Sequence, residues 1–427
     1  MAGIETKEKM DRKAVIVTIA VVLAMVVDGL DLQVLALAFP SFMKEMNMSP
    51  LMAGTLSTYT LIGMGLGGIS AGWMADRVGR VRVTWWSILM FSLCTGVIGF
   101  CQEYWQIAVM RFISGMGLGA VYMIGNLLVS EYVPTRIRNT VLSIVMAGWS
   151  FGYVVAALMS GIIMPTWGWR PMFMLAVVPG IICLIIMYGI SDPPSWFTAR
   201  TAARAAALKG AKKENEFVAI WKDKKIRITF ILWAVASVGL QYGYYGANTW
   251  LPSYLVKDLG VNLRNMGWFL AATYSMGILS KPVVGWLADR IGRRIMWVIT
   301  GLAVALYIPF VMNFATQANI AYLLLVFGCL YGALYAIFAT YLSESFPTSV
   351  RGTAMATSYN IGRIGSIISP LLIGWAATSY SIGIGIATCG IAYLMCALLP
   401  GIFIKEKMYD PKAIMATDTK MTEAVKA

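Results

Sequence analysis

The chain has 427 residues, of which 59% are hydrophobic and 13% are charged, and its mean hydropathy is +0.72. Soluble globular domains carry about 25% charged residues, so this composition excludes a soluble protein and indicates a membrane protein with several spans. The sequence has no histidine and its six cysteines form no C-x-x-C pair, so we expect no histidine catalysis, no metal site and no enzyme.

Apolar runs predict twelve transmembrane helices, because about 20 apolar residues at 1.5 Å per residue cross the hydrocarbon core. The predicted spans cover residues 14–39, 51–75, 83–101, 105–130, 140–163, 169–190, 228–251, 265–287, 295–315, 319–342, 353–377 and 381–404. A long polar segment separates them into two sets of six. We therefore predict an all-α membrane protein with an N-terminal six-helix bundle at residues 1–190, a cytoplasmic linker at 191–227, and a C-terminal bundle with a cytoplasmic tail at 228–427.

The net charge of +14 is explained by the loops between these spans. If the N-terminus is cytoplasmic, most lysines and arginines fall on the cytoplasmic side, as the positive-inside rule requires. We therefore expect both termini in the cytoplasm of a bacterial inner membrane, with the lipid bilayer as a partner and no nucleic-acid partner.

Two carboxylates, Asp28 and Asp31, lie inside the first predicted span. An acid at the centre of a membrane helix costs about 2.5–3.5 kcal/mol on insertion scales, so it indicates a functional site. In the fourth span, Arg111 lies nearer in depth to Asp31 than to Asp28 at a helical rise of 1.5 Å per residue. We expect these three residues to serve proton coupling, with an Asp31–Arg111 pair that protonation breaks. A static salt bridge between Asp31 and Arg111 is the alternative, and for Asp28 the alternative is a role in helix packing or in a water-filled cavity.

A nine-residue motif occurs twice, G-W-M-A-D-R-V-G-R at residues 72–80 and G-W-L-A-D-R-I-G-R at 285–293. The pattern E-x-x-P-T-x-x-R follows the fourth and tenth spans at the same offset. This indicates two parallel repeats related by a pseudo-two-fold axis. We expect the charged residues of these loops to close the cytoplasmic side, with Asp76 pairing with a helix end or with Arg138; a role in topology alone is the alternative. The loop residues are Asp76, Arg77, Arg80, Glu131, Arg138, Asp289, Arg290, Arg293, Glu344 and Arg351.

The doubled motifs resemble the major facilitator superfamily, and the resemblance covers residues 10–405. It implies two bundles that rock around a central cavity. The D-G-x-D of residues 28–31 is similar to the aromatic acid/proton symporter branch. The G-x-D at 29–31 and R-F-x-x-G-x-G at 111–117 are similar to proton-coupled sugar porters.

In the second half, Arg363 lies about 15 Å into the eleventh span, and no acid of that half lies at a similar depth. Such a cation indicates an anionic ligand, and Arg363 with Lys281 resembles the organic-anion carriers of the superfamily. Helix packing of Arg363 and snorkelling of Lys281 are the alternatives. The glycine-interrupted Gln241–Gly246 stretch predicts a discontinuous seventh span. Further substrate-binding candidates are Trp149, Gln241, Tyr245, Asn248, Tyr331, Tyr335 and Asn360.

The combined prediction is a monomeric secondary transporter that imports a small organic carboxylate by alternating access, with an aromatic acid as one candidate. The proton is the coupling ion, and no other cofactor is expected. Two alternatives within the superfamily are a neutral sugar/proton symporter, which has no use for Arg363, and an organic-anion exchanger. A non-transporting membrane sensor is the alternative from another functional class.

Overall fold

The computed structural model describes residues 10–134, 137–193, 216–347 and 350–405. Every regular element in these ranges is a helix, and helices occupy all twelve predicted spans. Among the described residues, ten helical segments of 18 to 35 residues are long and apolar enough to cross a membrane. The other two predicted spans are formed by α2 (Pro50–Val78) and α11 (Leu263–Ile291), each of 29 residues. The chain is therefore an all-helical membrane protein, as predicted.

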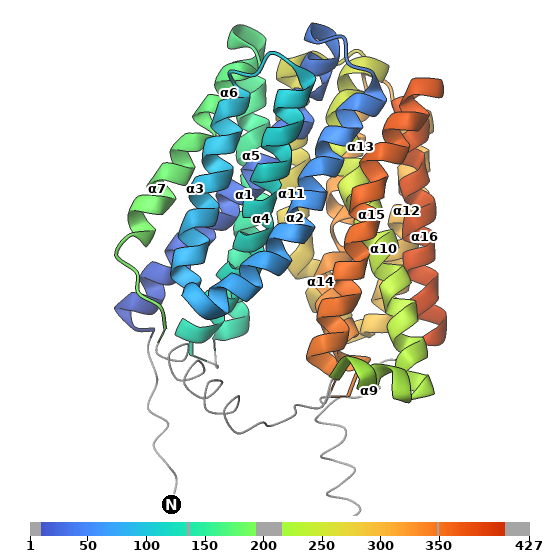
Figure 1. The fold of residues 1–427 in the computed structure, drawn as a ribbon. Helices are drawn as coiled ribbons and strands as arrows, with labels where there is room; N and C mark the ends of the chain where they lie inside the picture. The colour runs from blue at the N-terminus through green and yellow to red at the C-terminus, as the bar shows by residue number, and fades with distance from the viewer. Residues whose placement is uncertain (1–9, 135–136, 194–215, 348–349, 406–427) are drawn as a thin grey trace, which may run out of the picture. The chain divides into compact units, whose positions relative to one another are not determined.

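The described residues divide into two compact units (Figure 1). The first holds those within Met1–Lys212 and Leu255–Ser275, and the second holds those within Lys213–Tyr254 and Met276–Ala427. The boundary therefore falls inside α11. Besides α2 and the first part of α11, the first unit contains α1 (Arg12–Glu45), α3 (Arg80–Ile98), α4 (Tyr104–Tyr132), α5 (Arg138–Trp167), α6 (Arg170–Leu175) and α7 (Val177–Met187).

The second unit contains residues 276–291 of α11 and the remaining α-helices of the described residues. A π-helical turn, Tyr254–Asp258, follows the seventh span, and from Leu255 onward it belongs to the first unit. The helices are α9 (Glu216–Lys222), α10 (Lys224–Ser253), α12 (Arg293–Phe314), α13 (Ile320–Tyr331), α14 (Leu334–Glu344), α15 (Arg351–Ser379) and α16 (Ile382–Phe403).

Helix starts follow from local sequence. The helix α2 begins at Pro50, a residue with no N–H to leave unsatisfied, and the Ser49 hydroxyl accepts the Met52 N–H at 3.2 Å. Between α2 and α3, Gly79 has a φ of +119°, and its counterpart Gly292 in the second motif has +111°. Only glycine adopts such a conformation at low cost, which explains why both copies of the motif carry it.

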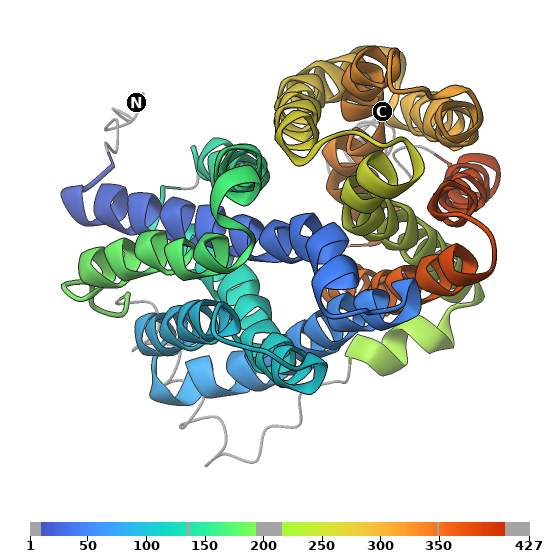
Figure 2. The ribbon, with the colours of Figure 1, turned by 90° about the horizontal axis from the view of Figure 1, so that it is seen from above.

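Glycines bring α2 and α4 of the first unit into backbone contact. The sequence G-M-G-L-G occurs in α2 at residues 63–67 and again in α4 at 115–119. A Cβ on Gly67 would lie 2.0 Å from the Met116 carbonyl oxygen, and a Cβ on Gly119 would lie 2.0 Å from that of Met64. Membrane helices associate through this kind of close packing because lipid supplies no hydrophobic drive between them. Elsewhere in the unit, α1 lies alongside α7 (Figure 2).

The predicted interruption of the seventh span is wrong, because α10 is continuous from Lys224 to Ser253. Its glycines serve close packing instead: a Cβ on Gly243 would lie 2.3 Å from the Tyr393 ring, and one on Gly246 would lie 2.8 Å from Ile373. The spans that are interrupted are the sixth, between α6 and α7, and the tenth, between α13 and α14 at Gly332. The tenth-span break matters for the candidate site, because Lys281 lies beside it.

Candidate functional site

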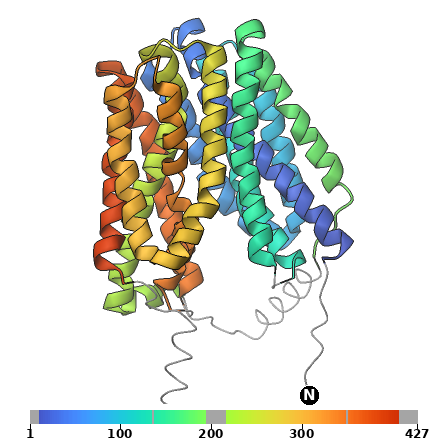
Figure 3. The ribbon, with the colours of Figure 1, turned by 180° about the vertical axis from the view of Figure 1, so that it is seen from behind.

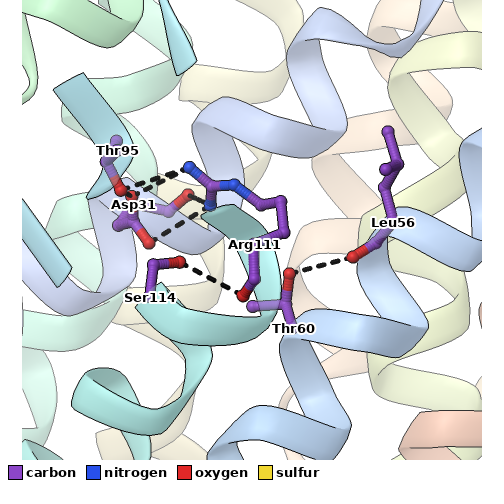
Figure 4. A network of polar contacts seen from close by, with 6 residues as sticks. All are labelled: Asp31, Leu56, Thr60, Thr95, Arg111 and Ser114. Carbon is purple, nitrogen blue, oxygen red and sulfur yellow. Dashed lines mark hydrogen bonds and ion pairs between the residues drawn. The ribbon is translucent and has the colours of Figure 1, made fainter. Parts of the chain in front are cut away.

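A buried ion pair joins α1 to α4 in the first unit. Arg111 Nη1 donates to Asp31 Oδ2 at 3.2 Å and Nη2 donates to Oδ1 at 3.3 Å, so the two groups meet in a bidentate arrangement. Asp31 is 1% exposed and Arg111 is fully buried. Figure 4 shows the two side chains directed toward one another. The pairing predicted from the depths of the two residues is present in the structure.

A third residue, Thr95 on α3, completes this network. Its hydroxyl donates to Asp31 Oδ1 and accepts from Arg111 Nη2 at 3.2 Å (Figure 4). Arg111 Nη1 also reaches the Asp31 carbonyl oxygen at 3.3 Å, and the Phe173 ring centroid lies 5.4 Å from the guanidinium carbon. A buried ion pair is tolerated when further hydrogen bonds satisfy its remaining atoms. Sequence reasoning missed Thr95, because a threonine in a membrane helix carries no charge that would single it out.

Two nearby hydroxyls do not join the network. Ser114 donates to the Arg111 carbonyl oxygen at 3.3 Å, and Thr60 donates to the Leu56 carbonyl oxygen at 2.9 Å, each within its own helix (Figure 4). Asp28 is fully buried one turn before Asp31 on α1. Two buried carboxylates thus lie one turn apart on α1, and Arg111 binds Asp31.

A second polar contact follows Asp31 by two residues. Gln33, 1% exposed, donates from Nε2 to the Tyr274 hydroxyl at 2.6 Å, which ties α1 to the part of α11 that belongs to the first unit. The Tyr153 ring of α5 meets the Tyr274 ring at 5.3 Å and the Trp149 ring at 4.6 Å. Trp149 was predicted as a substrate residue, whereas the other three were missed. Gln33 carried a usable signal, since an amide inside the first span has to be satisfied.

In the second unit, aromatic rings gather around Tyr244 of α10. Tyr331 stacks on it at 5.2 Å with an interplanar angle of 11°, and Tyr335 and Tyr245 meet it edge-on at 4.9 Å and 5.6 Å. Lys281 lies at the same place: its Cε is 3.4 Å from the position that a Cβ on Gly332 would take. The predicted residues Lys281, Tyr245, Tyr331 and Tyr335 therefore come together, and Tyr244 is the addition that the structure makes.

The remaining predicted substrate residues have different surroundings. Gln241 is buried and donates to the Tyr359 carbonyl oxygen of α15 at 2.7 Å. Asn248 and Asn360 donate to carbonyl oxygens one turn earlier in their own helices, at 2.8 Å and 2.9 Å. Arg363 is half-buried, and its Nε is buried without a hydrogen-bond partner among the described residues. A cation in this setting retains donors for an anion.

The charged loop residues form equivalent contacts in the two repeats. Arg80 pairs with Glu131, and Arg293, which occupies the same motif position, pairs with Glu344. Arg293 also reaches Asp289 at 3.2 Å. These contacts tie the residue that follows each turn glycine to the end of α4 or α14.

A second arginine of each motif also makes an equivalent contact in the two repeats. Arg77 lies over Trp73 at 3.6 Å and Arg290 over Trp286 at 4.0 Å, while Arg351 donates to the Phe346 carbonyl oxygen at 3.2 Å. The predicted pairing of Asp76 with Arg138 lies outside the described side chains.

Comparisons with known proteins place these features in a wider context. The profile of the Major Facilitator Superfamily matches residues 21–370 and 258–414. The chain is 43% identical to the cis,cis-muconate transport protein of Acinetobacter baylyi over 91% of its length and 94% of the relative. It is 27% identical to the gentisate transporter of Corynebacterium glutamicum, over 90% of this chain and 86% of that one.

A further relative is the benzoate transport protein of Acinetobacter baylyi, 27% identical over 83% of this chain and 81% of the relative. Among solved structures, a D-xylose-proton symporter superposes with a TM-score of 0.75 at 19% identity, covering 92% of this chain and 99% of that one. At this identity the likeness concerns the fold alone. It matches the all-helical architecture described above.

Proposed function

The chain belongs to the Major Facilitator Superfamily, and from this premise we propose that it imports a small conjugated or aromatic carboxylate together with protons. The names of three relatives, which refer to muconate, benzoate and gentisate, support a carboxylate with a planar carbon skeleton. The observation that carries the proposal is the half-buried Arg363, whose Nε has no hydrogen-bond partner among the described residues. A neutral sugar has no need of such a group.

In this proposal the second unit supplies the groups that recognise the substrate. Arg363 pairs with the carboxylate, and Lys281 adds a second positive charge beside the tyrosines. The ring cluster around Tyr244 offers flat faces and hydroxyl edges, which suit a planar acid that is apolar at one end and charged at the other. The buried amide of Gln241 holds α10 against α15 next to this region.

The first unit supplies the proton site. A proton on Asp31 removes its negative charge, so the attraction of Arg111 for this carboxyl falls and the network with Thr95 reorganises. Breaking such a pair without another change would leave a buried cation, which costs about 3–5 kcal/mol. Proton binding is therefore expected to take place together with a rearrangement of the helices, which is what alternating access requires.

The repeated loops are proposed to control access from the cytoplasm. We take the two bundles as residues 1–190 and 228–427, joined by a cytoplasmic linker, with both termini in the cytoplasm and the protein acting as a monomer. The basic loops support this orientation. The pairs Arg80–Glu131 and Arg293–Glu344 then lie on the cytoplasmic side, where each stabilises the helix ends of its own unit.

Uptake into proteoliposomes tests the function. Purified protein is reconstituted, an inward proton gradient is imposed, and labelled cis,cis-muconate, benzoate and xylose are compared. We expect accumulation of a carboxylate that collapses when a protonophore is added, and no accumulation of xylose. Uptake of xylose alone would establish the sugar alternative. Carboxylate uptake that requires a carboxylate inside the liposomes and does not respond to the proton gradient would establish an anion exchanger.

Arg363 is tested in the same system. Arg363→Ala should weaken carboxylate binding by at least about tenfold, since a charge-assisted hydrogen bond contributes about 1.5–3 kcal/mol. Arg363→Lys should recover part of the loss, because the charge remains while the planar fork is lost. Binding is measured by the shift in unfolding temperature on adding muconate. Unchanged affinity in the alanine variant would remove Arg363 from the substrate site.

A further inference from the structure

We propose that the hydrogen bond between Gln33 and Tyr274 is a positioning contact through which α11 links the proton site on α1 to the substrate-binding Lys281. The inference rests on the proposed function, because it assumes that Asp31 carries the proton and that Lys281 meets the substrate. Gln33 and Tyr274 themselves contact neither the proton nor the substrate. They determine how the state of one site is transmitted to the other.

Gln33 shares a rigid helix with the proton site. It follows Asp31 by two residues on the continuous α1, and both side chains are about 1% exposed. A helix moves as a nearly rigid rod over so short a distance. Any shift of α1 that accompanies loss of the Asp31–Arg111 pair therefore acts on the 2.6 Å bond from Gln33 Nε2 to the Tyr274 hydroxyl.

The outer part of α11 is firmly attached to α5 within the first unit. The Tyr274 ring lies 5.3 Å from the Tyr153 ring, and a Cβ on Gly267 would lie 2.4 Å from the Gly161 backbone nitrogen. This part of α11, in yellow in Figure 3, thus packs backbone to backbone on α5. At Tyr274 this part of α11 is also connected to α1, through the hydrogen bond from Gln33.

The geometry of α11 itself connects Tyr274 to Lys281. The two residues are seven positions apart, which places them about 10.5 Å apart along the axis and within about 20° of the same helix face. The helix is unbroken between them, although the two units divide between Ser275 and Met276. Lys281 Cε then lies beside Gly332 at the break in the tenth span. One helix face thus carries both the contact to α1 and the cation among the tyrosines.

Pro282 adds a place where α11 can adjust. It lies inside the helix directly after Lys281, and it has no N–H for the carbonyl oxygen of Ile278. The turn that carries Lys281 is therefore held less firmly than the outer part of the helix. A change at Tyr274 is expected to alter the direction of Lys281 without unfolding α11.

The test separates coupling from binding. Tyr274→Phe keeps the ring against Tyr153 and removes the hydroxyl, and Gln33→Met keeps the length of the side chain and removes the amide. Each is compared with wild type in two assays in proteoliposomes: accumulation of labelled cis,cis-muconate driven by a proton gradient, and exchange of labelled for unlabelled muconate with no gradient. Tyr322→Phe, a change at a 74% exposed tyrosine, is the matched control.

We expect both variants to retain exchange, and we expect gradient-driven accumulation to fall about fivefold. This is the factor that corresponds to the net free energy of one ordinary hydrogen bond. The double variant should lose no more than either single variant, because the two residues act through one bond. Full accumulation in both single variants would overturn the inference. So would a parallel loss of exchange and of muconate affinity, because this would make Tyr274 a substrate contact. Absence of exchange in the wild type would instead refute the proposed function, and this inference with it.

Discussion

Three groups meet at Asp31: the two terminal nitrogens of Arg111 and the hydroxyl of Thr95. They come from α4 and α3, so the charge on one carboxylate fixes the relative position of three helices. Neutral aspartic acid accepts the same hydrogen bonds less strongly and adds a donor of its own. A single proton is therefore enough to change the packing preference of the whole cluster.

The proposed proton role of Asp31 gives a direct prediction. Asp31→Asn keeps the shape of the side chain but removes the charge for good, so gradient-driven accumulation should be lost while exchange of substrate continues. The variant should also unfold at a lower temperature, since a buried cation that loses its partner costs about 3–5 kcal/mol. Asp11→Asn, at an exposed position, is the control. Coupled uptake that survives in Asp31→Asn would exclude Asp31 as the proton carrier.

The charged residues of this site could be predicted from the sequence, whereas several of its neutral residues could not. Asp31 and Arg111 stand out because a charge in an apolar helix is costly, and matching their depths was enough to pair them. Thr95 and Tyr274 carry no such cost, and their importance depends on which neighbours the fold brings to them. Tyr244 was likewise passed over in favour of its neighbour Tyr245, although its ring is the one at the centre of the cluster.

At the scale of helices, glycine has two uses that the sequence alone does not distinguish. In α10 the glycines allow α16 and α15 to approach, and the helix continues through them. At Gly332 the helix does stop, and α14 begins at Leu334. Both stretches look alike as apolar runs interrupted by glycine. Helix positions were therefore predictable from hydropathy, but the location of the breaks was decided by contacts between helices.

The crossing of α2 and α4 allows a test with an internal control. Gly67→Ala places a methyl group 2.0 Å from the Met116 carbonyl oxygen, whereas Gly65→Ala, two residues earlier on α2, meets no atom within 4 Å. The first change should cost about 1–3 kcal/mol through overpacking. The second should be neutral or stabilise by up to about 1 kcal/mol through helix propensity. Thermal unfolding in detergent measures both, and equal unfolding temperatures would contradict the close crossing.

At the scale of the whole molecule, the two repeats share their loops but not their buried charges. Arg80–Glu131 and Arg293–Glu344 occupy equivalent positions, as do Gly79 and Gly292 with their positive φ angles. Asp31, Arg111, Lys281 and Arg363 each have an uncharged residue at the equivalent position of the other half. The shared frame is thus symmetric, while the two halves differ in chemistry. In the proposed mechanism the first half handles the proton and the second half binds the anion.

The symmetric frame can be tested by exchanging charges within one repeat. Arg293→Glu alone places a third carboxylate beside those of Asp289 and Glu344. We expect this repulsion to slow transport about tenfold, which corresponds to a barrier higher by about 1.4 kcal/mol. Combining it with Glu344→Arg restores opposite charges at 13–20% exposed side chains and should recover most of the rate. Lys224→Glu, at an exposed position at the start of α10, controls for the change in net charge. If the double variant transports no faster than Arg293→Glu alone, Arg293 and Glu344 do not act as a pair. Control of access would then have to lie with other residues of the repeated loops.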